Sequence, residues 1–430
     1  MLSAPRHHRL ASHDLSFGRP RVLFLSYRFP YPLIGGDRIK AFHLIRHLSE
    51  NAHVDLIALD EANCATEENV QHVTPYANVK VVPFDKMKAG KRIVKSLMTD
   101  VPIEFAYYND PVMQHAVDEA LATHKYDLII CFFLRTAGFV TLHTSTPKLL
   151  VAEDARVVLQ ERASEKFEFG PQYFVRKIDA TKLRAYEPKV MKQGFERVTF
   201  VSRADERRIL ASDPSLPTDI LSNGVSLKEY EFSSGEREDK IVFSGHLGTY
   251  HNILMAERLL KDIYPKIREV SPRTKLSIIG KSPGKDLQRL VERTAGAELH
   301  PDVKDVRPFL RSSKVFCHPQ TVGAGIQNKL LEAMGIGTPV VTTPIGAAGI
   351  QGLEDNVNAL VRISDQEIIE ATLSLLKNDE KANRLATNAR QLIEAQYTWE
   401  HVYDKLDSII SELVPTFFGD LQPKKSLVKT

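Results

Sequence analysis

The residues of this sequence best suited to chemistry lie between Gly323 and Thr342. Gly323 and Gly325 form a glycine loop after an apolar run with the pattern of a strand, and a helical pattern follows the loop. At the start of such a helix the backbone N–H groups of Gly325, Ile326 and Gln327 have no partner within the helix, and the helix dipole adds partial positive charge. This loop could therefore bind an anion such as a diphosphate.

Polar residues continue the pattern on the helix itself. Asn328 and Glu332 are four residues apart and so share one face. The apolar residues expected to pack on a sheet are Leu330, Leu331 and Met334. Lys329 could neutralise a diphosphate, and Glu332 could accept hydrogen bonds from both hydroxyl groups of a ribose, which indicates a nucleotide-sugar site. The alternative is that Lys329 and Glu332 form only a surface ion pair worth about 0.3 kcal/mol, and that the glycines only cap the helix.

A second pair of glycines, Gly35 and Gly36, follows the first apolar run and precedes a helical pattern at 39–49. Paired glycines at a helix N-terminus also leave N–H groups open to a phosphate. A tight turn without a ligand explains them equally well. The GxGxxG pattern is absent here, which argues against a nicotinamide cofactor.

These loops belong to two series in which apolar strands alternate with helices. The expected strands are 22–26, 53–59, 79–83, 128–133, 149–152, 198–201 and 219–221 in the first series, and 241–244, 276–279, 315–318, 339–342 and 359–361 in the second. The charged stretch 233–240 separates the series as a linker. Nearly continuous apolar strands of this kind predict parallel sheets covered on both faces. The fold class is therefore α/β, with two doubly wound domains.

The expected boundaries follow from these patterns. Residues 21–232 form the N-terminal domain and residues 241–397 the C-terminal domain. Residues 398–414 form a helix with apolar residues at helical spacing, which returns to the N-terminal domain. Residues 1–20 are expected to be a mobile tail, and residues 415–430 a second tail.

Several motifs, in this order along the chain, resemble the GT-B glycosyltransferases of family four, the glycosyl transferases group 1. The donor-site signature of these retaining enzymes is similar to KLLEAM and GTPVV at 329–341. The other matching motifs are Gly35-Gly36, Ser222-Asn223-Gly224-Val225, Val242-Phe243-Ser244-Gly245 and Tyr397-Thr398-Trp399. The resemblance covers residues 21–414 and is greatest to a bacterial exopolysaccharide subgroup that carries GAGIQNK before LEAM.

The resemblance implies two Rossmann-like domains that face a cleft, with the acceptor on the N-terminal domain and the nucleotide-sugar donor on the C-terminal domain. It implies transfer with retention, in which the leaving diphosphate accepts the proton of the acceptor, so that neither a metal nor a cofactor is expected. Lys329 and Glu332 are the catalytic candidates. The expected donor-binding residues are Gly35, Gly36, Gly245, His246, Gly323, Gly325, Ile326, Gln327, Asn328, Lys329 and Glu332.

The sequence departs from the family pattern at three places. Ala324 stands eight positions before Glu332, where many members have another glutamate, and His246 stands where members often have an arginine. The stretch 131–135 lies where members often offer a histidine to the sugar, and Arg135 is the candidate that remains there. Asp154, in an acid-rich turn after a strand, either lines the acceptor cleft or caps a helix.

Composition excludes several other classes of protein. The chain of 430 residues has 57 Lys and Arg against 54 Asp and Glu, a balance too even to indicate a nucleic-acid partner. Its three cysteines are far apart and indicate neither a disulfide framework nor a zinc site. No apolar run reaches the roughly 20 residues of a transmembrane helix, so we expect a cytoplasmic protein. Basic stretches at 86–95 and 176–192 could contact the inner face of a membrane or hold a lipid diphosphate acceptor, and solvated helix faces are the alternative.

The leading hypothesis is a hexosyltransferase that moves a sugar from a UDP- or GDP-linked donor to a glycan or lipid-linked acceptor, in exopolysaccharide or cell-surface polysaccharide biosynthesis. One alternative is a GT-B sugar-nucleotide epimerase or hydrolase. Another is a non-catalytic GT-B partner in a glycan assembly complex, an idea that Ala324 and His246 keep open.

Overall fold

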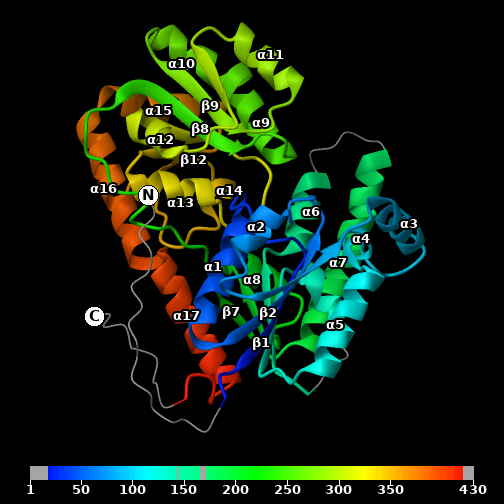
Figure 1. Cartoon of the computed structure of the whole chain (residues 1–430). Helices are drawn as coiled ribbons and strands as arrows, with labels where there is room; N and C mark the ends of the chain where they lie inside the picture. The colour runs from blue at the N-terminus through cyan, green and yellow to red at the C-terminus, as the bar shows by residue number, and fades with distance from the viewer. Residues whose placement is uncertain (1–17, 142, 144, 165–170, 420–430) are drawn as a thin grey trace.

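The computed structural model describes residues 18–141, 143, 145–164 and 171–419. Of the two expected tails, residues 1–17 and 420–430 lie outside this range. The described strands form two separate sheets in which every pair of neighbours is parallel, and helices cover both sheets (Figure 1). The α/β class with two Rossmann-like domains is therefore confirmed.

The first sheet has seven strands in the order β3-β2-β1-β4-β5-β6-β7. Its strands are β1 (Arg21–Ser26), β2 (His53–Asp60), β3 (Asn78–Pro83), β4 (Leu128–Phe132), β5 (Lys148–Glu153), β6 (Arg197–Phe200) and β7 (Thr218–Ile220). The helices of this part are α1 (Gly36–Asn51), α2 (Glu67–Gln71), α3 (Lys86–Ser96), α4 (Ile103–Tyr108), α5 (Pro111–Thr123), η1 (Leu134–Phe139), α6 (Arg156–Ser164), α7 (Pro171–Gly194) and α8 (Arg203–Leu210).

The second sheet has six strands in the order β10-β9-β8-β11-β12-β13. Its strands are β8 (Glu238–His246), β9 (Lys275–Lys281), β10 (Ala297–Pro301), β11 (Ser313–His318), β12 (Val340–Thr342) and β13 (Leu360–Val361). The helices after β8 are α9 (Tyr250–Arg258), η2 (Leu259–Ile263), α10 (Tyr264–Val270), α11 (Lys285–Arg293), α12 (Arg307–Ser312), α13 (Asn328–Ile336), α14 (Pro344–Ala347), α15 (Asp365–Lys377), α16 (Asp379–Gln396) and α17 (Trp399–Leu413).

Alternation along the strands explains how the second sheet is covered. Ile241 and Phe243 of β8 belong to one core, together with residues of α9, α10, α11 and α15. Val242 belongs to the core on the opposite face, with residues of α12, α13 and α16. Successive side chains of a strand point to opposite faces, so the nearly continuous apolar runs of the sequence are the signature of a sheet buried on both sides. The expected packing of Leu330, Leu331 and Met334 in the core under α13 is confirmed.

The chain crosses between the two sheets twice. The first crossing segment is 221–237, between β7 and β8, and the second is 397–398, between α16 and α17; the two lie side by side. The amide of Val225, on the first crossing, donates to the carbonyl oxygen of Tyr397 on the second at 2.8 Å. After Tyr397, α17 leaves the second sheet, and its apolar face packs in the core of the first one (Figure 1). Gly224 is required at the first crossing because a Cβ atom there would lie 2.6 Å from the Trp399 ring.

Two features differ from the sequence-based expectation. β8 begins at Glu238, so the last three charged residues of the expected linker lie in the strand. The strand β10 was not expected at all. It is an edge strand, with residues 297–300 only partly buried, and an edge position does not require the continuous apolar run by which the other strands are recognised.

The packing of α17 leads to a stability prediction. Ile410 is fully buried in the first core, so we expect Ile410→Ala to lower the free energy of unfolding by about 2 to 4 kcal/mol, the usual cost of such a cavity. Urea unfolding followed by fluorescence of Trp399, the one tryptophan of the chain, measures the change. Ser408→Ala, on the exposed side of the same helix, is the control, and an equal loss in both variants would contradict the described packing.

Candidate functional site

The residues singled out in the sequence meet where the strand order of each sheet reverses. In the second sheet this point lies between β8 and β11, because the chain leaves β8 toward one face and β11 toward the other. In the first sheet it lies between β1 and β4. A crevice forms at the carboxyl ends of the strands at such a point, and doubly wound proteins bind ligands there. Gly35, Gly245 and Gly323 all lie in loops that follow these strands or at their ends.

The loop before α13 has a backbone that favours glycine. Gly323 has φ +151° and Gly325 has φ +68°, both in the region that residues with a side chain rarely adopt. A Cβ atom on Gly323 would lie 2.0 Å from the side-chain nitrogen of Gln320, which is buried and donates to the carbonyl oxygen of Val322. No side chain caps the helix at Gln327. The described geometry therefore leaves the first N–H groups of α13 free of a side-chain cap, and Ile326 and Gln327 precede them directly.

Lys329 extends from this helix toward β8. Its Nζ atom donates to Oδ1 of Asn252 and lies 5.5 Å from the centre of the Phe243 ring. Burial lowers the pKa of Lys329 to about 8, and the neighbouring Glu332 acts in the opposite direction. The amine therefore sits in a partly dry site, where it is held in place by one neutral acceptor and one aromatic face.

Asn252 is the partner of Lys329, a contact that the sequence did not reveal. It is buried on the first turn of α9, and its Nδ2 atom donates to the carbonyl oxygen of His246 at 3.0 Å and to Oγ1 of Thr249 at 2.9 Å. These two bonds orient the amide so that Oδ1 faces Lys329. Gly245 packs on the same side chain, since a Cβ atom there would lie 2.9 Å from its Cγ atom.

Glu332 lies one turn after Lys329 and contacts the first crossing segment. Its carboxylate accepts a hydrogen bond from the hydroxyl of Tyr230. Burial raises the pKa of Glu332, whereas Lys329 and the Tyr230 hydroxyl act in the opposite direction. Tyr230 is itself fixed by Arg390, which donates to its carbonyl oxygen and to that of Gly335, both at 2.6 Å.

The histidines near Lys329 contribute little positive charge. Burial, with Lys329 as the next cause, lowers the pKa of His251 to about 4 and that of His318 well below its ordinary value. Both rings are therefore neutral at pH 7. His246 is exposed, and its Nδ1 atom accepts a hydrogen bond from the amide of Gly248 at 3.2 Å. Lys329, and not these two buried histidines, therefore supplies positive charge at the start of α13.

The two domains touch at Asn328, the first residue of α13. A Cβ atom on Gly36 would lie 2.6 Å from its Nδ2 atom, so the glycine allows α1 to approach α13 closely. The Oδ1 atom of Asn328 accepts a hydrogen bond from Asn223 at 2.6 Å. Asn328, expected among the donor-binding residues, therefore also joins the domains. Nearby, a Cβ atom on Gly325 would lie 3.4 Å from that of Asp154, so these two residues face one another across the interface.

A buried ion pair lies directly behind Gly36 on the N-terminal domain. Nζ of Lys40, one turn further along α1, is 2.6 Å from Oε1 of Glu153 and donates to the carbonyl oxygen of Leu221 at 2.7 Å. Glu153 ends β5 and has φ +71°. This strained residue turns the chain toward Asp154 and the cleft. Burial raises the pKa of Glu153 to about 7, although Lys40 acts in the opposite direction.

Of the two acceptor-side candidates, Asp154 lies at the interface and Arg135 lies within the N-terminal domain. The guanidinium of Arg135 pairs with Glu104 and lies 4.3 Å from the centre of the Tyr27 ring. Arg156 also pairs with Glu104, at 3.0 Å, and with Asp154, at 3.1 Å. The two arginines lower the pKa of Glu104 to about 2 against the effect of burial. Arg135 is thus paired within the N-terminal domain. Asp154 lies at the other end of the same set of ion pairs, at the surface of the cleft.

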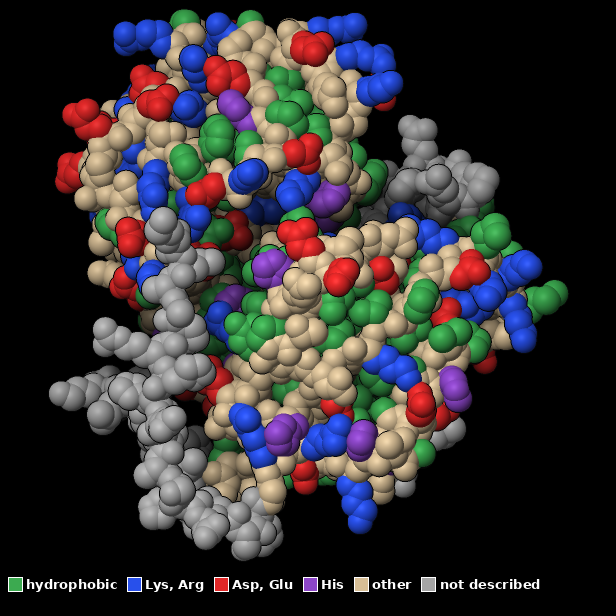
Figure 2. All heavy atoms as spheres, in the orientation of Figure 1, with side chains coloured by type: hydrophobic (Ala, Val, Ile, Leu, Met, Phe, Trp, Pro, Cys, Tyr) green, Lys and Arg blue, Asp and Glu red, His purple; other side chains and the backbone are tan. Residues whose placement is uncertain are grey.

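A cavity of about 380 Å³ opens beside the donor loop. It is lined by residues of both domains, among them Glu161 and Arg208 from the first and Ala324, Gly325 and Gly349 from the second. In Figure 2, acidic, basic and histidine side chains gather along the seam between the upper and the lower domain. The space between the domains is thus polar and has room for a ligand next to the glycine loop.

The chain is similar in sequence to several known proteins. Residues 238–378, which contain β8 to α15, match the family of glycosyl transferases group 1. An uncharacterized glycosyltransferase of Methanocaldococcus jannaschii is 24% identical, over 91% of this chain and 98% of that protein. An uncharacterized 44.6 kDa protein in the cps region of Klebsiella pneumoniae is 21% identical, over 90% and 98%.

The fold of this chain is similar to that of solved structures. HepE of Anabaena in complex with UDP has a TM-score of 0.65 at 15% identity, over 91% of this chain and 100% of that one. The same protein has also been solved with UDP-glucose. The match to the glycosyl transferases group 1 family covers about a third of the chain, and it lies within the C-terminal domain. Together the matches support a glycosyltransferase with the GT-B fold.

The raised pKa of Glu153 predicts how stability depends on pH. Its ordinary value is 4.5 and its value in the fold is about 7, so between these pH values the folded chain binds this proton more tightly than the unfolded chain. Glu153 therefore makes the free energy of unfolding fall as the pH rises through this window. We expect Glu153→Gln to flatten that fall in urea unfolding measured across the window. Glu236→Gln, an exposed substitution with the same change in net charge, should keep the wild-type slope; an unchanged slope in Glu153→Gln would show that this carboxyl does not titrate there.

Proposed function

We propose that this protein is a hexosyltransferase that binds a UDP- or GDP-linked sugar and transfers the sugar with retention to a glycan or lipid-linked acceptor. The observation that carries the proposal is the placement of Lys329 and Glu332 on one turn of α13, where the strand order reverses and the glycine loop opens. One side chain suits a diphosphate and the other suits a ribose. The UDP and UDP-glucose complexes of Anabaena HepE support a nucleotide-sugar donor.

In this proposal the chemistry is mainly electrostatic. The diphosphate lies against the N–H groups of Gly325, Ile326 and Gln327 and against Lys329, so negative charge that develops as the sugar leaves meets fixed donors. Groups oriented before the reaction stabilise such charge without reorganisation. Asn252 and the Phe243 ring position Lys329 for this role. The diphosphate itself accepts the proton of the acceptor hydroxyl on the same face of the sugar.

The acceptor would enter from the side of the N-terminal domain, through the cavity beside the donor loop, where Gly325 lines the cavity and faces Asp154. Asp154 is held by Arg156, so its carboxylate can accept a hydrogen bond from an acceptor hydroxyl in a fixed orientation. The relative in the cps region supports a role in cell-surface polysaccharide synthesis. A donor that is consumed at the same rate with and without an acceptor would point instead to an epimerase or hydrolase.

Lys329→Ala should weaken the binding of UDP or GDP about 10- to 100-fold, the usual effect of losing a charged hydrogen bond. Because the pKa of Lys329 is lowered to about 8, the amine is protonated below that pH, and wild-type affinity should fall as the pH rises through it. Lys329→Arg keeps its charge at high pH and should remove this dependence. Isothermal titration calorimetry across the pH range measures both effects.

Lys285→Ala, an exposed substitution in the same domain, is the matched control for the loss of a lysine. Wild-type affinity in Lys329→Ala, with an intact circular dichroism spectrum, would contradict the donor site.

The role of Glu332 can be tested with the ligand as well as with the protein. Wild-type protein should bind the nucleoside diphosphate more tightly than its 2′,3′-dideoxy analogue, and Glu332→Ala should bind the two equally, since the carboxylate no longer meets the ribose hydroxyls. Tyr230→Phe is the control, because it removes the hydroxyl that contacts Glu332 but leaves the carboxylate. A preference for the ribose that survives in Glu332→Ala would exclude this assignment.

A further inference from the structure

Large apolar side chains are exposed in one region of the N-terminal domain far more than elsewhere. The described residues include fourteen exposed large apolar side chains, and half of them lie in two short segments. These are Met87, Val94, Leu97 and Met98 in segment 86–98, and Phe174, Val175 and Ile178 in segment 174–178. Scattered apolar side chains on a surface need no explanation, but a cluster marks a contact. We name this cluster the α3 surface.

The helix α3 has large apolar side chains on the side opposite to its buried one. Ala89 and Ser96 are buried against the domain. Met87 and Val94, at the same spacing of seven residues, are 81% and 66% exposed. The backbone continues to turn past the end of α3, where the amide of Met98 donates to the carbonyl oxygen of Lys95, and Met98 is 93% exposed. A helical period of 3.6 residues places 87, 94 and 98 on one outward stripe. The packing of the buried side of the helix does not explain why these outward residues are apolar.

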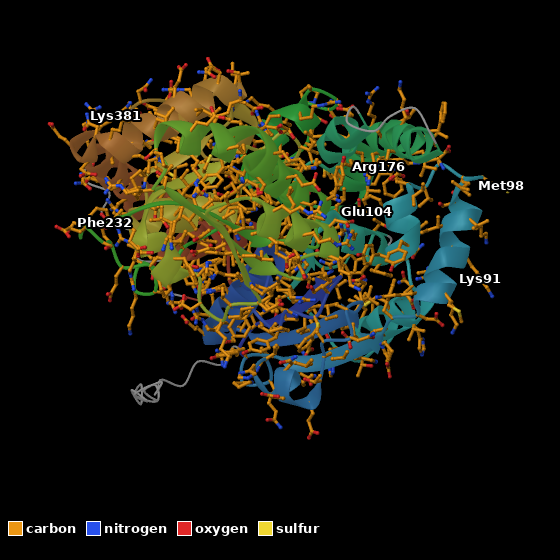
Figure 3. All side chains as sticks on the ribbon, turned by 90° about the horizontal axis from the view of Figure 1, so that it is seen from above. Lys91, Met98, Glu104, Arg176, Phe232 and Lys381 are labelled. Carbon is orange, nitrogen blue, oxygen red and sulfur yellow. The ribbon has the colours of Figure 1, made fainter. Side chains whose placement is uncertain are left out.

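The second segment lies next to the C-terminal end of α3. Lys182 of α7 donates to the carbonyl oxygen of Ser96 at 2.7 Å, and Asp179 accepts a hydrogen bond from the amide of Ile103 at 2.6 Å. Ile178 lies one helical turn before Lys182 and therefore on the same side of α7. Figure 3 shows Met98 and Lys91 at the outer edge of the domain, with Arg176 on the neighbouring helix. The two segments thus form one surface.

Lysines border the apolar stripe. Segment 86–98 contains four lysines and Arg92 but no acidic residue. Lys88, Lys91 and Lys95 are exposed and share one flank of the stripe, and Lys88 comes within 3.8 Å of Asp85 at the start of the helix. Figure 2 shows this mixture of blue and green side chains at the right edge of the molecule, where Figure 1 places α3. An apolar stripe flanked by lysines is complementary to a bilayer surface that carries anionic headgroups.

The α3 surface also lies on the side of the domain that faces the candidate site. β3 ends at Pro83 and α3 begins at Lys86, so α3 starts at the carboxyl edge of the sheet. α6 leaves the carboxyl end of β5, and α7 runs back to the start of β6, so the N-terminal part of α7 lies at the same edge. Gly35 and Asp154 follow strands β1 and β5 at this edge too.

We propose that the α3 surface docks the protein on a bilayer that contains anionic lipids, with the apolar stripe among the headgroups and the lysines against their charge. This goes beyond the proposed function, because it assigns a surface and a partner rather than a ligand of the cleft. It also gives the cleft an orientation. An acceptor anchored in the same bilayer would reach the carboxyl edge of the first sheet without leaving the membrane.

The test is flotation of the whole protein with large unilamellar vesicles, in the absence of nucleotide. One set of vesicles is phosphatidylcholine alone and the other is phosphatidylcholine mixed with phosphatidylglycerol. We expect binding to the mixed vesicles that weakens as salt is added. The triple substitution Met87→Ser, Val94→Ser, Met98→Ser and the triple substitution Lys88→Gln, Lys91→Gln, Lys95→Gln should each lower the bound fraction, about tenfold or more for the lysines.

Matched controls come from the second domain. Val270→Ser, Val357→Ser, Ile363→Ser removes three exposed apolar side chains, and Lys266→Gln, Lys285→Gln, Lys304→Gln removes three exposed lysines. Both controls should float like the wild type. Equal binding to neutral vesicles, or wild-type flotation of both α3 variants, would overturn the proposal. So would conversion of a dimer to a monomer by the serine variant in size-exclusion chromatography, since the surface would then cover a second copy.

Nucleotide binding, measured separately, keeps the two proposals distinct. A protein that floats but binds no nucleoside diphosphate supports the membrane surface and overturns the proposed function. A protein that binds nucleotide but does not float does the reverse.

Discussion

The buried amine of Lys40 holds together the segments on which the cleft depends. Its contacts with Glu153 and with the carbonyl oxygen of Leu221 join α1, the end of β5 and the start of the first crossing segment. Each of these segments carries a residue at the interface: Gly36 lies one turn before Lys40, Asp154 follows Glu153, and Asn223 follows Leu221 by two residues. Removing one partner of a buried pair leaves an uncompensated charge, which is far more costly than the pair itself. The contacts of Lys40 therefore fix the positions of three interface residues, Gly36, Asp154 and Asn223.

On the opposite side of the cleft, Lys329 is held in position without losing its positive charge. Lys329 carries positive charge next to the glycine loop, whereas the buried histidines beside it are neutral at pH 7. Its partner Asn252 is an uncharged acceptor, so the amine is oriented without being neutralised. A carboxylate in that place would hold the amine more tightly but would also cancel the charge that an anionic ligand needs. The neutral Asn252 side chain and the Phe243 ring fix the position of the Lys329 amine and leave its positive charge available to a ligand.

Sequence patterns predicted the elements of the fold better than they predicted the contacts of the site. Apolar runs and helical spacing predicted both sheets and the core face of α13. Burial on both sides of a sheet requires apolar residues at regular positions, and this pattern is visible in the local sequence. No local sequence pattern indicates the contacts of Asn252 and Tyr230. They meet Lys329 and Glu332 only through the packing of α9 and of the first crossing segment. The partners of Arg135 were likewise beyond local reasoning, since Glu104 belongs to a separate helix.

The two crossings determine how the sides of the cleft can move relative to one another. Leu221 is attached to the first domain through Lys40. Val225 is paired with the second crossing, and Tyr230 is attached to the second domain through Arg390 and Glu332. The span between these attachments is residues 222–224, and in it Gly224 is packed against Trp399. Asn223 lies in the same span and donates to Asn328 at the start of α13. This one side chain therefore links the first crossing to the N-terminal end of α13.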